Sequence, residues 1–208
     1  MDGTMINNMM VHHRAWQRKL KAMGMDLPLE DVMEKVHGVN EEILERLFGD
    51  RYTAQERRQH SYEKEEEYRK IFKPELKLID GLFEFLKRLE KKGIPMAIGS
   101  AAPPENVDFV LDNLNIRSFF KVVLHARSVS RGKPDPEIYQ KAADGLALSP
   151  RDCLIFEDAP VGAEAARRVG SQAIIVTTTH AADEFVKFPH VIRFISDFKD
   201  SFLKTLSF

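Results

Sequence analysis

Short apolar runs that do not alternate with polar residues constrain the fold of this chain more than any other feature. They lie at residues 94–98, 122–124, 153–156, 173–176 and 191–192. Stretches with the apolar spacing of helices separate them. A strand that is apolar on both faces must be covered on both, as in a parallel sheet with helices on either side. The sequence therefore predicts an α/β fold with a doubly wound (Rossmann-like) parallel sheet.

The first third of the chain has a different pattern, which is helical and highly charged. Apolar residues form one stripe on a helix that begins near Asn40, and residues 53–71 predict a long, mainly solvated helix. We interpret residues 9–74 as an α-helical cap domain inserted near the N-terminus. The remaining residues, 1–8 and 75–208, then form the core domain.

Composition excludes several classes of protein. The 208 residues include 31 Lys and Arg against 32 Asp and Glu, a net charge of −1 that does not favour nucleic-acid binding. No apolar run approaches the roughly 18–20 residues needed to span a membrane, and no secretory signal is visible. The single cysteine, Cys153, cannot form an internal disulfide. We therefore expect a cytoplasmic monomer with no nucleic-acid or membrane partner.

Polar residues follow the apolar runs of the predicted sheet. Ser100 comes after the first run, Lys133 lies in the loop beyond the second, and Glu157 and Asp158 follow the third. Ligands of open α/β sheets bind at the carboxyl ends of the strands. A hydroxyl, an ammonium and carboxylates at this edge suit a divalent hard cation beside a phosphoryl group.

Each of these residues alone also has a plain structural interpretation. The Asp2-Gly3 pair is a common turn, and Ser100 fits an ordinary loop that leads into a helix. Asp158 could cap the helix that follows it. The adjacent acids Glu157 and Asp158 are harder to explain in this way, because they repel each other and need a cation or donors nearby.

Taken together, four motifs resemble those of the haloacid dehalogenase superfamily, in particular its β-phosphoglucomutase-like phosphatase branch. They are residues 1–4, 99–100, 132–136 and 156–162, and the spacings between the last three leave room for one strand–helix unit each. The resemblance runs from Met1 to the strand at Val191, and the helical insert resembles the cap domain of that branch.

The resemblance implies a role for each matching residue. Asp2 would protonate the leaving group and then activate water, with Thr4 following it in the motif. Ser100, with Ala101 beside it, and Lys133 would bind the phosphoryl oxygens.

The resemblance also implies an Mg²⁺ cofactor. The ion would be held by the catalytic nucleophile, by the backbone carbonyl of Asp2 and by Asp158. Glu157 would assist directly or through water.

The family's nucleophile is an aspartate two residues before the one that matches Asp2, and Met1 lies between these two positions. We therefore expect the nucleophile just before Met1, outside this chain, together with the apolar strand that precedes it in the family. That strand is central in the family's sheet, between the strands that end at Ser100 and Glu157. We interpret Met1 as an internal residue of a longer protein whose start is truncated or misassigned.

Two residues of the predicted cap match positions that face the substrate in the mutase branch. They are His12, near the junction with the core, and Lys64 on the long helix. A surface histidine and one more charge on a solvated helix are the alternatives. The branch also has an arginine shortly after a Gly-Val pair. Here Gly38-Val39 is followed by Asn40 and Glu41, with an acid where the arginine would be. This difference favours simple hydrolysis over binding of a bisphosphorylated sugar.

These features predict an Mg²⁺-dependent phosphatase of small phosphorylated metabolites that acts through an aspartyl-phosphate, with sugar phosphates as the favoured substrates. A β-phosphoglucomutase-type phosphotransferase is the alternative enzyme. If Met1 is the true start, a non-catalytic module that binds phosphate and metal is the alternative from another class. A dehalogenase is disfavoured, because haloacid chemistry does not need the cation site that Asp2, Glu157 and Asp158 form.

Overall fold

The computed structural model describes residues 1–206, which form two compact units. The helical unit is Asn8–Leu76, and the core unit combines Met1–Asn7 with the chain from Lys77 onward. No helix within residues 1–206 is both long enough and apolar enough to cross a membrane.

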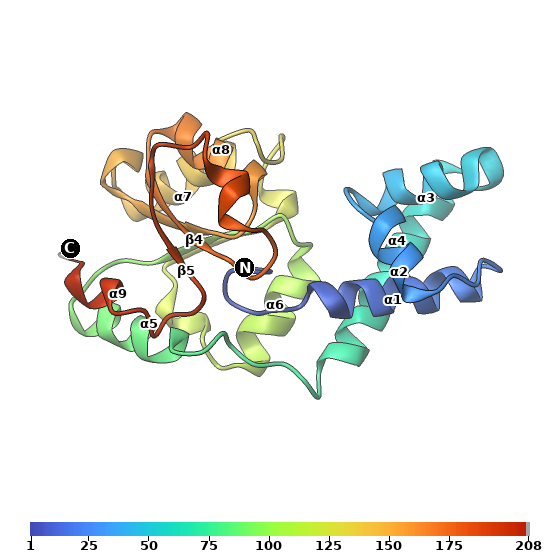
Figure 1. Cartoon of the computed structure of the whole chain (residues 1–208), viewed down its shortest axis with the longest axis horizontal. Coiled ribbons are helices and arrows are strands. Elements are labelled where there is room, and N and C mark those ends of the chain that lie inside the picture. Colours follow the sequence, from blue (N-terminus) through green and yellow to red (C-terminus); the bar gives the residue numbers. More distant parts are fainter. Residues whose placement is uncertain (207–208) are drawn as a thin grey trace. The chain divides into compact units, whose positions relative to one another are not determined.

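The helical unit contains four helices: α1 (Met9–Ala22), α2 (Leu29–Lys35), α3 (Asn40–Phe48) and α4 (Ala54–Phe72) (Figure 1). Their apolar faces meet in a core that includes Trp16, Leu20, Val32, Ile43 and Leu44. A reciprocal capping box starts α4, in which Glu56 and Thr53 satisfy each other's backbone N–H groups.

The expectation that α4 is mainly solvated is wrong for its second half. Lys64, Glu65 and Tyr68 are buried there, with Lys64 only 2% exposed. Their polar atoms have partners, because Lys64 Nζ donates to Glu65 Oε1 at 2.7 Å and Asn8 Nδ2 donates to the Tyr68 hydroxyl at 2.7 Å. Sparse apolar spacing predicts a solvated helix only when its polar groups have no partners inside the protein. Here these groups do have such partners, so they can be buried.

The core unit has the predicted α/β architecture. Its strands are β1 (Ala97–Gly99), β2 (Val122–Leu124), β3 (Leu154–Glu157), β4 (Gln172–Val176) and β5 (Val191–Ile195), and its helices are α5 (Leu82–Lys91), α6 (Pro104–Asn113), α7 (Glu137–Leu146), α8 (Pro160–Val169) and α9 (Phe202–Thr205). Every strand pair is parallel. One sheet has the order β1-β2 and the other β3-β4-β5, so within residues 1–206 no strand joins β1 to β3.

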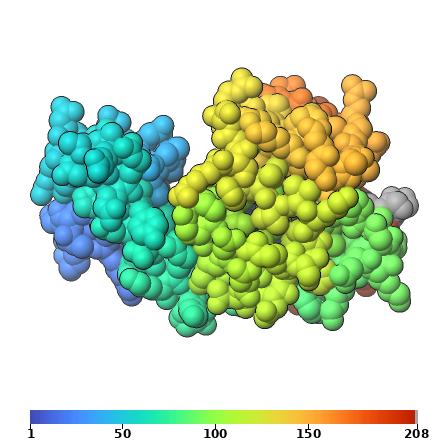
Figure 2. Space-filling model, turned by 180° about the vertical axis from the view of Figure 1, so that it is seen from behind, coloured from blue at the N-terminus to red at the C-terminus, as the bar shows by residue number. Residues whose placement is uncertain are grey.

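Helices cover both faces of these strands, which confirms the doubly wound arrangement. On one face, Tyr139 of α7 and Ala166 of α8 pack against Ala173 of β4. On the other, the rings of Phe85 (α5) and Phe156 (β3) lie 5.4 Å apart, in contact with a third ring from Phe198. In the space-filling view, the lime and yellow residues of α6 and α7 cover much of the core unit on the visible side (Figure 2).

Candidate active site

Ser100 directly follows β1 and begins the loop that leads to α6. It is 2% exposed, and its backbone N–H donates to the Leu124 carbonyl at 3.0 Å, which extends the β1-β2 ladder by one residue. Its Oγ accepts a hydrogen bond from the Ala102 backbone N–H at 3.1 Å. Ala101, between them, is exposed. The hydroxyl is therefore held in place at the carboxyl end of a strand, where ligands of such sheets bind.

Glu157 is the last residue of β3 and is only 4% exposed. Its Oε1 accepts hydrogen bonds from Lys133 Nζ and from the Tyr139 hydroxyl. Its Oε2 accepts from the Asp158 backbone N–H at 3.0 Å. Burial disfavours the charged form, but the Lys133 ammonium outweighs this effect and holds the pKa of Glu157 well below its usual range.

Asp158 connects the first motif to the end of β3. Its Oδ1 accepts from Thr4 Oγ1 at 3.2 Å, and its Oδ2 accepts from Thr179 Oγ1 at 2.5 Å. Gly3 lies so close that a Cβ there would be 2.0 Å from Asp158 Oδ2. Burial, followed by the neighbouring charge of Glu157, raises the pKa of Asp158.

The structure thus brings together most of the core residues that the sequence predicts for the site. Lys133 and Glu157 form an ion pair, and Thr4 contacts Asp158. Asp2 is adjacent to Gly3, and its backbone forms an isolated parallel bridge with Ile6. Which roles these residues have stays a prediction.

Sequence reasoning missed three residues in this cluster. Thr178 donates to the Gly3 carbonyl and Thr179 to Asp158, and both lie in the loop that follows β4. Their position past an apolar run is the same signal that selected Ser100, so it could have found them. Tyr139 had no such signal, because its spacing along α7 marked it as a core residue.

The donor set fits a hard divalent cation. Asp158 offers a largely buried carboxylate whose pKa is raised by burial and by the charge of Glu157, and the hydroxyl and carbonyl oxygens around it are hard ligands. No group of three His, Cys, Asp or Glu side chains within residues 1–206 is arranged to bind a metal alone. Mg²⁺ does not require one, since it is commonly held by one or two carboxylates, waters and substrate phosphate.

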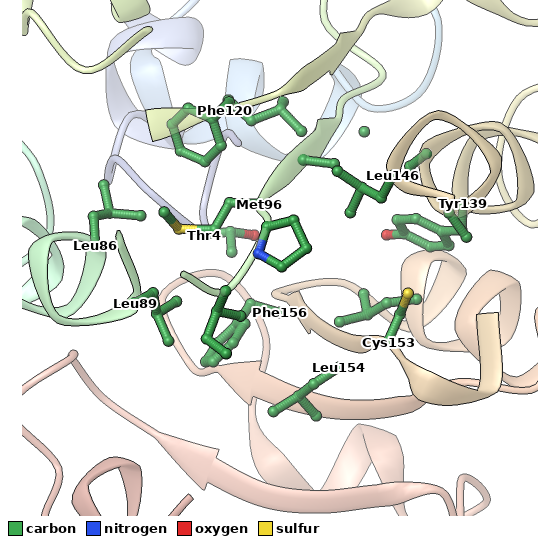
Figure 3. Close-up of a pocket in the computed structure, with 18 of the residues that line it drawn as sticks. Thr4, Leu86, Leu89, Met96, Phe120, Tyr139, Leu146, Cys153, Leu154 and Phe156 are labelled. Carbon is green, nitrogen blue, oxygen red and sulfur yellow. The ribbon is translucent and has the colours of Figure 1, made fainter. Parts of the chain in front are cut away.

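A cavity of about 250 Å³ lies between β1 and β3. Its lining is mainly apolar and includes strand residues such as Ile98 and Phe156 and the buried Met1. Leu86 and Leu89 of α5 border it on one side, and Leu146 of α7 with Tyr139 on the opposite side (Figure 3). The cavity therefore separates the facing edges of the two sheets and is enclosed by helices on both faces.

His12 and Lys64 lie together in the helical unit. Lys64 Nζ and His12 Nδ1 are 3.1 Å apart, and the His12 ring stacks on Tyr68 with 3.9 Å between centroids. Lys64 is buried, so the alternative of one more charge on a solvated helix is wrong for it. The contact of His12 and Lys64 with substrate stays a prediction.

The sequence profile of the haloacid dehalogenase-like hydrolases matches residues 1–170. The chain belongs to this family. β-Phosphoglucomutase of Bacillus subtilis is 32% identical over 184 residues, which cover 84% of this chain and 79% of that protein. A phosphorylated carbohydrates phosphatase of Thermotoga maritima is 29% identical over 180 residues, 84% of this chain and 81% of its own length.

Other relatives are much longer than the aligned region. A validoxylamine A 7′-phosphate phosphatase of Streptomyces hygroscopicus is 37% identical over 105 residues, 50% of this chain and 49% of that protein. A chloroplastic 5-amino-6-(5-phospho-D-ribitylamino)uracil phosphatase of Arabidopsis thaliana is 30% identical over 99% of this chain and 56% of its own length. The chain thus spans about half the length of these two relatives.

Solved structures confirm the fold. A family IA hydrolase of this superfamily from Entamoeba histolytica superposes with a TM-score of 0.86 at 24% identity, covering 96% of this chain and 91% of that one. CbbY from Rhodobacter sphaeroides superposes with a TM-score of 0.80 at 21% identity, covering 96% and 92%.

Proposed function

We propose that this protein is an Mg²⁺-dependent phosphatase of small phosphorylated metabolites, with sugar phosphates as the favoured class. The observation that carries the proposal is the cluster of Lys133, Glu157 and Asp158, with Thr4, at the carboxyl end of β3 in a chain of this family. The relatives support the substrate class, because their names describe phosphatases and a mutase of phosphorylated sugars and similar metabolites.

The residues of this chain would bind the phosphoryl group, transfer protons and hold the metal ion. Lys133 offsets the negative charge of the phosphoryl oxygens, and the Ser100 hydroxyl donates a hydrogen bond to one of them. Asp2 protonates the leaving oxygen and later accepts a proton from water. Asp158 and the backbone carbonyl of Asp2 would hold Mg²⁺, which when bound neutralises charge on the phosphoryl group.

The covalent step needs an aspartate positioned directly before Met1. The carboxylate would attack phosphorus in line with the leaving oxygen, and an aspartyl-phosphate would form as that P–O bond breaks. Water then attacks the phosphorus, and the carboxylate leaves. Met1 lines the cavity between β1 and β3, so an aspartate joined to its N-terminus would lie next to the ends of these two strands.

Three proteins test this proposal: the 208-residue chain, the chain with an apolar strand ending in Asp joined to Met1, and the same extension ending in Asn. With a metabolite panel and Mg²⁺, the Asp extension should release phosphate many orders of magnitude faster than the other two. Equal rates from all three proteins would rule out the aspartyl-phosphate mechanism. Binding of phosphate without turnover in all three would instead favour a non-catalytic module.

The 32% identity to a β-phosphoglucomutase keeps a phosphotransferase as the second candidate. Glu41 argues for hydrolysis, because it places an acid where the mutase branch has an arginine that would bind a bisphosphorylated sugar. Release of phosphate without a sugar bisphosphate activator would identify a phosphatase. A strict requirement for that activator would identify a mutase.

A further inference from the structure

Tyr139 contacts both members of the ion pair at the end of β3. Its hydroxyl donates to Glu157 Oε1, the same oxygen that accepts from Lys133. The face of its ring lies 5.0 Å from Lys133 Nζ, within the range of a cation–π interaction. Tyr139 is 9% exposed, so both contacts are made away from bulk water, where they are strongest.

The Glu157 carboxylate is enclosed on all sides by the protein itself. Lys133 and Tyr139 donate to one oxygen, and the Asp158 backbone N–H donates to the other. A Cβ at Gly162 would lie 2.1–2.3 Å from the carboxylate atoms, so α8 closes the remaining side. These contacts describe an anchor for Lys133 better than an open cation ligand.

A lysine ammonium has three N–H donors. One is directed to Glu157, and the ring of Tyr139 limits where the ammonium can move, which leaves the other donors for a phosphoryl group. Without the hydrogen bond from the phenol hydroxyl, the Glu157 carboxylate would attract the Lys133 ammonium more strongly and hold it closer. The Tyr139 hydroxyl and the Lys133 ammonium therefore donate to the same carboxylate oxygen, and the hydroxyl limits how closely Glu157 draws the ammonium away from a bound phosphate.

We propose that Tyr139 is a positioning residue that fixes the Lys133–Glu157 pair and thereby presents the Lys133 ammonium to phosphate. This inference rests on the proposed function for the identity of the ligand. The geometry of the three side chains does not depend on that function.

The test uses Tyr139→Phe, which removes the hydroxyl and keeps the ring, with the exposed Tyr62→Phe as a matched control. Two quantities are measured: the ¹⁵N NMR signal of the Lys133 ammonium, and the affinity for inorganic phosphate in the presence of Mg²⁺. In Tyr139→Phe we expect the ammonium signal to shift or broaden and the phosphate Kd to rise about tenfold. Tyr62→Phe should change neither quantity.

A double-mutant cycle with Glu157→Gln shows whether Tyr139 acts through Glu157. If it does, Tyr139→Phe has no further effect on phosphate affinity in the Glu157→Gln background. An undiminished effect there, or an unchanged ammonium signal and affinity in the single variant, overturns the proposal. A lower free energy of unfolding in urea, with no change in the ammonium signal or the phosphate affinity, also overturns it, because Tyr139 would then only pack in the core.

The two proposals fail in different ways. A wild-type chain that does not bind phosphate contradicts the proposed function, and the ammonium signal of Tyr139→Phe still decides whether Tyr139 positions Lys133. If the Glu157→Gln variant does not fold, the ammonium signal of Tyr139→Phe alone decides whether Tyr139 positions Lys133.

Discussion

Thr4 and Asp158 are 154 positions apart in the sequence, yet Thr4 Oγ1 donates a hydrogen bond to Asp158 Oδ1 at 3.2 Å. Gly3 approaches the same carboxylate so closely that no side chain fits between them. These contacts join the N-terminal turn to the end of β3. They also make Asp158 the carboxylate on which the candidate site depends most.

Replacing Asp158 with Asn should remove most of the affinity for Mg²⁺. The amide keeps the shape and one acceptor oxygen but loses the charge that attracts a hard cation, so we expect the Kd to rise at least about tenfold. Titration calorimetry of both proteins measures the change, with the exposed Asp183→Asn as a control. Equal Mg²⁺ binding by wild type and Asp158→Asn would show that this carboxylate is not a ligand.

Replacing Lys133 with Met should destabilise the protein strongly. Glu157 is buried and would keep its charge without a cation, a loss of about 3–5 kcal/mol in the free energy of unfolding. The double variant Lys133→Met, Glu157→Gln should recover most of that loss, because no buried charge remains. Urea unfolding of the three proteins checks this, and a double variant no more stable than Lys133→Met contradicts it.

Replacing Gly162 with Ala should also destabilise the protein, although alanine is the better helix former by about 1 kcal/mol. The new Cβ would collide with the Glu157 carboxylate, which cannot shift without losing its bonds to Lys133 and Tyr139. Gly132→Ala is the matched control, because a Cβ there meets no atom within 4 Å. If urea unfolding shows the same stability for both variants, the close approach of α8 to Glu157 is wrong.

The stability that Glu65 contributes should depend on pH. Burial raises its pKa, but the charges of Lys64 and His12 and hydrogen bonds from Lys64 and Asn40 outweigh burial and lower it from 4.5 to about 2. A carboxyl with a lowered pKa stabilises the folded state above its unfolded pKa, and that contribution is lost as the pH falls through the folded pKa. Glu65→Gln should therefore cost roughly 2–3 kcal/mol at pH 7 and progressively less between pH 4.5 and pH 2.

Urea unfolding of wild type and Glu65→Gln between pH 7 and pH 3 measures this difference. Glu67→Gln is the control, since Glu67 forms an exposed ion pair with Arg18 and should contribute less than about 1 kcal/mol. If the difference in the free energy of unfolding between wild type and Glu65→Gln stays constant with pH, the Glu65 charge does not contribute the predicted stability.

The parallel strands and the helices between them could be predicted from apolar spacing, because burial on both faces leaves a clear signal. The same logic located Ser100, Glu157 and Asp158 at strand ends. It failed for Lys64, since a charged residue on a polar helix looks solvated until its partners are known. It also failed for the hydroxyl of Tyr139, because spacing identifies a buried ring but not the atom that its polar end contacts.

The insertion of the helical unit after Asn7 has a consequence for how the protein is made. Thr4 bonds to Asp158, and the Gly3 carbonyl accepts from Thr178, 175 positions later. On the ribosome, Gly3 and Thr4 must therefore wait until Asp158 and Thr178 emerge before they can form these bonds. The helical unit, which is a compact unit of its own within residues 8–76, can fold during that time. The inserted helical unit is thus complete first, and the core unit, whose two segments flank it in the sequence, is complete last.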